Sequence, residues 1–172
     1  MKIPKIVWFD SIGVGLFTFI YSLIMTGFSL WMGAAAFIAV SFFFGAGFPK
    51  DKIWNIIASF IAGIIWGLIA YNLLQIPAIS TMWASAIMFG IMTFLALFLQ
   101  GTVLKFTIVP AWLITWGTFM LIVSNIAVNN WPLFVFQLLA SMLLGIFGIG
   151  YTSHYLNKWL FHLFPDKDDQ SK

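Results

Sequence analysis

The sequence predicts an all-α integral membrane protein with six transmembrane helices. Three observations carry this prediction: the composition, a series of apolar runs and the placement of the lysines. Hydrophobic residues make up 62% of the 172 residues and charged residues 8%, whereas soluble domains carry about 25% charged residues. The mean hydropathy is +1.03. Because so little polar surface is available to coat a soluble globule, lipid must surround most of the chain.

Apolar runs of membrane length, which is about 20 residues for a helix, follow one another along the chain. Charges, prolines or polar clusters separate them into six predicted spans: Ile6–Met25, Leu30–Phe48, Ile53–Tyr71, Ile79–Leu99, Phe106–Ser124 and Leu133–Thr152. Strands of a membrane barrel would be alternating segments of about 10 residues. These runs are longer and uniformly apolar, which favours helices. Pro110 either kinks the fifth run or belongs to its first turn.

All eight basic residues are lysines, and the six-span layout places every one of them on the same side of the membrane. They lie before the first run, between the second and third, between the fourth and fifth, and after the sixth: Lys2, Lys5, Lys50, Lys52, Lys105, Lys158, Lys167 and Lys172. Because positively charged connections stay in the cytoplasm, both chain ends are expected there. The formal net charge of +3 therefore indicates topology rather than a nucleic-acid-binding surface.

An internal repeat is suggested by NIIASFIAGI at residues 55–64, which returns as QLLASMLLGI at residues 137–146. The first run agrees as well, since Trp8, Gly15, Thr18 and Phe19 recur as Trp83, Gly90, Thr93 and Phe94. We expect one membrane domain over residues 1–172, with repeat halves of about 1–75 and 76–160 and a cytoplasmic tail at 161–172. Chance matches in a sequence rich in Phe, Ile, Leu and Gly are the alternative explanation.

Three spans per half is an odd number, so the second copy would enter the membrane from the opposite face. Such a 3+3 inverted repeat is a common plan for transporters, with the solute site near the interface of the repeats.

Small and polar residues recur at every fourth position of the repeated segment and so form one stripe on each helix. For Gly63, Gly67 and Gly145 we favour helix packing, because small residues let helix backbones approach closely. For the polar members, packing and a polar track for a solute are both open. The candidate lining residues are Asn55, Ser59, Gln137 and Ser141, with Thr18 and Thr93 behind them.

Groups that could perform chemistry are scarce. Asp10 is the only acidic residue within a predicted span, and it lies near the cytoplasmic end. Cysteine is absent, and His154 and His162 without a nearby carboxylate make a poor metal site. No nucleotide-binding or catalytic motif is present. We therefore expect no enzyme, no cofactor and no metal.

The neutral hydroxyls, amides and aromatics that remain can replace the hydration of a small uncharged molecule but offer no counter-charge to an ion. The sequence therefore predicts a channel or facilitator for a solute of the urea, amide, ammonia or polyol class, working as a homo-oligomer. Two alternatives stay open. One is the substrate-binding subunit of a vitamin-uptake complex, and the other is a structural or regulatory membrane protein that transports nothing.

Several segments resemble the YcdZ-like family of small bacterial inner-membrane proteins, a domain of unknown function. The similar segments cover a little over a third of the chain: SLWMGAAAFIAVSFFFG at 29–45, FIAGIIWG at 60–67, FLALFLQ at 94–100, VPAWLITWGTF at 109–119 and NNWPLFVFQLLASMLLGIFGIGY at 129–151. The resemblance implies a multi-pass protein of the bacterial inner membrane with unassigned activity. It supplies no binding residues.

Overall fold

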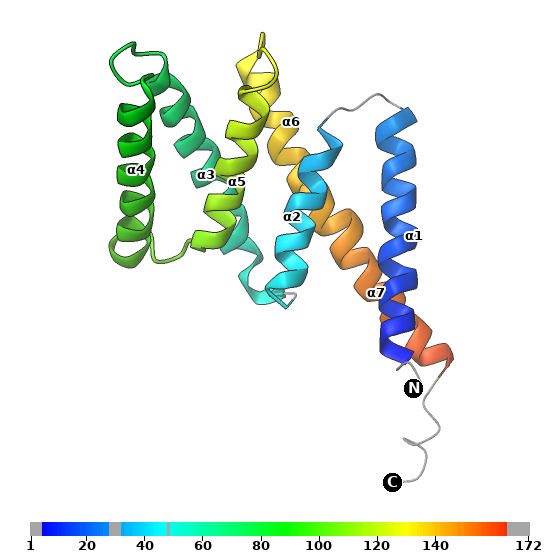
Figure 1. Ribbon diagram of the computed structural model, residues 1–172. Coiled ribbons are helices and arrows are strands. Elements are labelled where there is room, and N and C mark those ends of the chain that lie inside the picture. The colour runs from blue at the N-terminus through cyan, green and yellow to red at the C-terminus, as the bar shows by residue number, and fades with distance from the viewer. Residues whose placement is uncertain (1–4, 28–31, 48, 165–172) are drawn as a thin grey trace. The chain divides into compact units, whose positions relative to one another are not determined.

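The structure is a computed structural model that describes residues 5–27, 32–47 and 49–164 (Figure 1). These residues are helical and contain no strand, which confirms the predicted all-α class for the described chain. The elements in chain order are α1 (Lys5–Gly27), α2 (Gly33–Gly45), the 3₁₀ turn η1 (Lys50–Lys52), α3 (Ile53–Leu74), α4 (Met82–Thr102), α5 (Val109–Val123), α6 (Trp131–Leu144), the π-helix η2 (Gly145–Tyr151) and α7 (Thr152–Leu163).

Four helical stretches are long and apolar enough to cross a membrane. They are Lys5–Ile24, Ile53–Leu74, Met82–Thr102 and Trp131–Leu163, with mean hydropathies between 1.6 and 2.2. α2 and α5 are equally apolar but shorter, at 13 and 15 residues, which is about 20 and 22 Å of helix against about 30 Å of bilayer core. The apolar helices indicate a membrane protein.

The helical ends differ from the predicted spans in two places. The second predicted span, Leu30–Phe48, includes residues outside the described ones. The sixth was expected to end at Thr152, whereas helical structure continues through α6, η2 and α7 to Leu163 because polar residues such as Asn157 are accommodated on a packed face. Residues 161–163 of the predicted tail are therefore helical, and residues 165–172 lie outside the described chain. Pro110 belongs to the first turn of α5.

Contacts divide the chain into two compact units. Unit 1 comprises Met1–Phe44 and Ser141–Lys172, and unit 2 comprises Gly45–Ala140. The predicted repeat halves group residues by sequence similarity, whereas the units group residues by contact. The units therefore do not test the predicted halves.

Unit 2 is built on α3, which packs along α5 in the same direction. Gly63 of α3 lies against Trp112, and Gly67 lies against Phe119 further along both helices. α4 packs beside both α3 and α5, and the indole Nε1 of Trp66 in α3 donates a hydrogen bond to the carbonyl of Met92 at 3.1 Å. The core of this contact consists of Ala70, Met88, Met92 and Trp116.

Unit 1 holds α1 against α7 in antiparallel fashion (Figure 1). The rings of Phe9 and Phe161 meet edge to face with centroids 4.8 Å apart, and Gly13 lies against Ser153 and Asn157. The core joins α1, α2 and η2 through Tyr21, Ala36, Val40 and Ile149.

A seven-residue π-helix, η2, interrupts the last long helix. Hydrogen bonds from i to i+5 place more residues in each turn than an α-helix does, and they disturb the regular ladder of backbone bonds. Hydroxyls compensate for this disturbance. Thr152 donates to the carbonyl of Gly148, and Ser153 donates to the carbonyl of Gly150 at 2.9 Å. The sequence after η2 is therefore turned relative to an uninterrupted α-helix.

Candidate functional site

Ser59 connects α3 to the start of α5 through hydrogen bonds. Its side chain is fully buried. The hydroxyl donates to the carbonyl of Asn55 at 2.6 Å and accepts the backbone N–H of Ile108 at 2.7 Å. Ile108 is the residue immediately before α5. The hydroxyl predicted to line a solute path is thus engaged on the main chain at the beginning of a short helix.

Ser141 makes a related contact at the start of α2. It is buried, its hydroxyl donates to the carbonyl of Met32 at 2.7 Å, and Met32 is the residue before Gly33, where α2 begins. The phenolic oxygen of Tyr21 lies 3.4 Å from the Ser141 hydroxyl. Sequence reasoning missed Tyr21, because nothing in the pattern of α1 indicates which helix lies opposite.

The stripe glycines lie where helices approach most closely. A Cβ added to Gly63 would stand 2.5 Å from the carbonyl oxygen of Trp112, and one added to Gly67 would stand 2.5 Å from the ring of Phe119. A Cβ on Gly145 would stand 2.2 Å from the carbonyl oxygen of Ala36. At such distances a methyl group cannot be added unless the neighbouring atoms move, and at Gly63 and Gly145 the nearest of these is a backbone atom. By contrast, nothing lies within 4 Å of a Cβ on Gly15 or Gly90.

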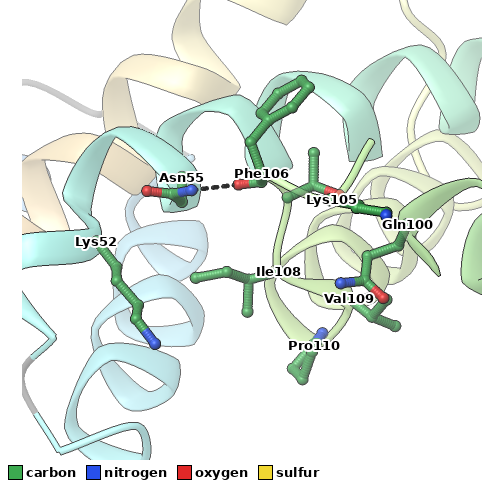
Figure 2. Close-up of a pocket in the computed structure, with 9 residues that line it drawn as sticks. Lys52, Asn55, Gln100, Lys105, Phe106, Ile108, Val109 and Pro110 are labelled. Atoms are coloured by element: carbon green, nitrogen blue, oxygen red, sulfur yellow. Dashed lines mark hydrogen bonds between the residues drawn. The ribbon is translucent and has the colours of Figure 1, made fainter. Parts of the chain in front are cut away.

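Asn55 borders the polar pocket of unit 2. This pocket has a volume of about 410 Å³ and is lined by Lys52, Asn55, Gln100, Lys105, Phe106, Thr107, Ile108, Val109 and Pro110. The Asn55 amide donates to the carbonyl of Phe106 at 2.5 Å. In Figure 2, Asn55 and Lys52 lie on one side of Ile108, and Gln100 and Lys105 lie on the other.

The polar pocket combines positive charge, amides and apolar surface. Its two lysines are exposed, and none of its nine lining residues in the described chain is acidic. Sequence reasoning used Lys52 and Lys105 only as markers of topology and did not consider Gln100. One feature of the sequence could have indicated this pocket: each lysine lies within five residues of an amide at a helix end.

The other three candidate lining residues lie on α1, α4 and α6. Thr18 in α1 and Gln137 in α6 are half-buried. Thr93 in α4 is exposed and donates to the carbonyl of Phe89 in its own helix at 2.8 Å. The recorded contacts thus group Asn55 with Ser59 near the start of α5, and Ser141 with Tyr21 near the start of α2.

A separate polar contact joins α1 to α7. The amide nitrogen of Asn157 donates to a carboxylate oxygen of Asp10, while the amide oxygen of Asn157 is buried and accepts no hydrogen bond. The room for this side chain comes from Gly13, since a Cβ there would stand 2.7 Å from the same oxygen. Within residues 5–27, 32–47 and 49–164, no group of three His, Cys, Asp or Glu residues lies close enough to hold a metal ion.

Comparison with protein families identifies the group to which this chain is related. The model of a family described as "protein of unknown function (DUF1097)" matches residues 11–158, which is most of the sequence. The chain belongs to the DUF1097 family. No curated protein and no solved structure matches it. Membership of an uncharacterised family is thereby confirmed, and the more specific YcdZ-like resemblance stays a prediction. DUF1097 carries no assigned activity, so function must be argued from the geometry.

Proposed function

We propose that this protein is a membrane facilitator for a small uncharged solute, built from six spans as a 3+3 inverted repeat. The observation that supports this proposal best is the pair of short helices α2 and α5, which stand second in the two predicted halves. In transporters built from inverted repeats, unusually short apolar segments at corresponding positions are the best pointer to the solute site.

The contacts of α2 and α5 support their equivalence. Each short helix is met by a serine hydroxyl at its start, by a glycine one turn later and by a second glycine facing a phenylalanine. These contacts are Met32–Ser141, Ala36–Gly145 and Phe43–Gly150 for α2, and Ile108–Ser59, Trp112–Gly63 and Phe119–Gly67 for α5. Met32, Ala36 and Phe43 each precede their counterparts Ile108, Trp112 and Phe119 by the same 76 positions.

Helix directions support six crossings. If the chain crosses the membrane at every helix, odd spans run one way and even spans the other. Residue numbers rise together along α3 and α5 and along α2 and η2, and they run in opposite directions along α1 and α7. α2 and α5 can cross if their flanking residues and some local thinning of the bilayer make up the missing length, each at modest cost.

The proposed solute is neutral because the helices offer no charge at depth. Asp10 is the only acidic residue in the α-helices of the described chain, and it lies in the second turn of α1. Asn55 and Gln137 are the proposed lining residues, since an amide can both donate to and accept from a polar solute. The hydroxyls of Ser59 and Ser141 hold the short helices in place, and Thr18 and Thr93 have secondary roles.

Orientation and assembly belong to the same proposal. The lysines favour cytoplasmic ends, and the resemblance to the YcdZ-like family favours the bacterial inner membrane. A homo-oligomer is expected because six helices, two of them short, enclose little space alone. The lack of catalytic motifs argues for transport rather than catalysis.

The test is solute-induced swelling of proteoliposomes that contain the purified protein. Urea, acetamide and glycerol should enter faster than in protein-free vesicles, and the double variant Asn55→Leu, Gln137→Leu should abolish the increase. The matched control is Asn72→Leu, Asn125→Leu, because both of those amides are exposed and bond only to their own helices. Wild-type vesicles that swell no faster than empty ones would refute the proposal.

One specific observation favours a second candidate, a structural membrane protein that transports nothing. Ser59, Ser141, Gly63 and Gly145 all serve contacts between helices. The swelling experiment separates the two functions. If the structural role is correct, neither the wild type nor the Asn55 and Gln137 variant will change permeability, although both will fold.

A further inference from the structure

We propose that the polar pocket of unit 2 binds the phosphate group of an anionic phospholipid. Asn55 lines this pocket and is also a proposed solute-lining residue, so the lipid proposal is tested with the two lysines, which have no part in the transport proposal. Its chemistry, two ammonium groups and two amides beside apolar side chains, suits a phosphodiester attached to hydrophobic material.

The position of the polar pocket matches a membrane boundary. Lys52 directly precedes α3, Gln100 belongs to the last turn of α4, and Val109 begins α5. The pocket therefore lies where three apolar helices terminate: at the start of α3, the end of α4 and the start of α5. The lipid headgroup layer begins where such helices end, so a headgroup phosphate has access to the pocket without leaving its leaflet.

The charge of the polar pocket selects an anion. Lys52 and Lys105 contribute two positive charges, and the acidic residue nearest in sequence, Asp51, is not among the lining residues. Val109 and Pro110 are the first residues of α5, and a helix N-terminus carries a partial positive charge. Basic pockets between membrane helices are a known way of recognising anionic lipid headgroups.

Hydrogen bonding and apolar surface add specificity. The amide of Gln100 lies on the same side of Ile108 as Lys105, facing Lys52 across the pocket (Figure 2), and it can donate to a phosphate oxygen. Phe106, Ile108 and Val109 supply apolar walls, which the glycerol and first methylenes of a lipid can cover. Inorganic phosphate shares the charge but leaves these walls bare, so the lipid is the better fit.

The experiment measures lipid binding to the full-length protein in detergent by native mass spectrometry. Phosphatidylglycerol and cardiolipin should bind more tightly than phosphatidylcholine. Lys52→Gln and Lys105→Gln should each weaken phosphatidylglycerol binding by about fivefold, from about 1 kcal/mol per lysine near an anionic headgroup. The matched control is Lys158→Gln, which removes the same charge from α7 outside the pocket.

Three outcomes decide the matter. Selective loss in the two pocket variants, with Lys158→Gln like wild type, supports the site. Equal losses in all three variants would show general attraction to positive charge and overturn it. If inorganic phosphate at equal concentration displaces phosphatidylglycerol, the pocket takes a free anion and the assignment to lipid is wrong. Circular dichroism of each variant verifies that the helices are intact.

Discussion

Unit 1 and unit 2 each contain a helix interface of the same kind, which we call the shared interface. They differ in a second helix interface. In both units a short helix is held by a serine, a glycine and a glycine–phenylalanine contact. At the second interface, unit 1 joins α1 to α7 by a hydrogen bond between two side chains, Asp10 and Asn157. Unit 2 joins α4 to α3 through apolar side chains such as Met88 and Ala70, and its hydrogen bond runs from the Trp66 indole to a backbone carbonyl.

The difference shows which contacts depend on shape and which depend on chemistry. A close approach of two backbones favours glycine, because a side chain added there would overlap atoms of the neighbouring helix. An interface without such an approach can be apolar or hydrogen-bonded, since both satisfy the helices in lipid. The shared interface is therefore the one at which substitution is expected to lower stability most, and in both units.

The largest effect is expected from removing the buried phenylalanines of the shared interface. Phe119→Ala and Phe43→Ala should each lower the free energy of unfolding by about 3–5 kcal/mol, because both side chains are fully buried. Denaturant unfolding of the purified protein in micelles measures the change. Phe94→Ala, at a position that is 66% exposed, serves as the control. If only one of the buried pair is sensitive, the interfaces are not equivalent.

Adding a methyl group to the contact glycines should lower the free energy of unfolding somewhat less than removing the phenylalanines. Gly145→Ala and Gly63→Ala are expected to destabilise the protein by about 1–3 kcal/mol, with Gly145 the worse because the three nearest atoms are all backbone atoms of Ala36. Gly148→Ala is the control in the same π-helix, since nothing lies within 4 Å of its added Cβ. Thermal unfolding followed by circular dichroism compares the three. Gly145→Ala as stable as Gly148→Ala would contradict the close approach.

Removing the serine hydroxyls should have a smaller effect. Ser59→Ala and Ser141→Ala are each expected to cost about 1 kcal/mol, as for hydrogen bonds in membranes. Ser59→Ala should be the larger loss because it leaves the N–H of Ile108 without its acceptor. Ser85→Ala provides a baseline, since that hydroxyl is exposed and bonds to Met82 in its own helix. Hydrogen exchange at Ile108 reports on the lost bond directly, and unchanged protection would rule out this role.

The smallest effect is expected from deleting Gly148. Gly63 and Gly67 are four residues apart, whereas Gly145 and Gly150 are five apart, and the π-helix lies between the latter two. Deletion should convert η2 into α-helix and keep the contacts of Gly145 with Ala36 and of Gly150 with Phe43, so the free energy of unfolding should stay close to the wild-type value.

Deleting Ile65 from α3 is the matched experiment and should have the opposite result. It would turn the rest of α3 by one residue and move Gly67 away from Phe119. Melting temperatures of the two deletion variants make the comparison. If deleting Gly148 lowers the melting temperature as much as deleting Ile65 does, the π-helix η2 does not result from one extra residue in an otherwise repeated helix contact.

Sequence reasoning predicted the helical class, the apolar character and the stripe that carries Ser59, Gly63, Ser141 and Gly145. It could not identify the residue that each of them contacts. It read Gly13 and Gly15 as a closely packed pair, and Gly15 and Gly90 as repeated positions. Only Gly13 makes a close contact, with α7, and nothing lies within 4 Å of a Cβ on Gly15 or Gly90. It also compared the segment at 55–64 with the segment at 137–146 at one constant offset, and the π-helix breaks that offset after Gly145.

The sequence by itself determined that this chain forms apolar helices suited to lipid, because the length and composition of an apolar run are sufficient to decide burial in a bilayer. Only the tertiary structure decided what the polar residues do. A hydroxyl, an amide or a lysine acts on whatever faces it, and the segment that faces it comes from a distant part of the chain. For that reason the contact of Ser59 with Ile108, and the meeting of Lys52 and Lys105 at one pocket, became visible only in three dimensions.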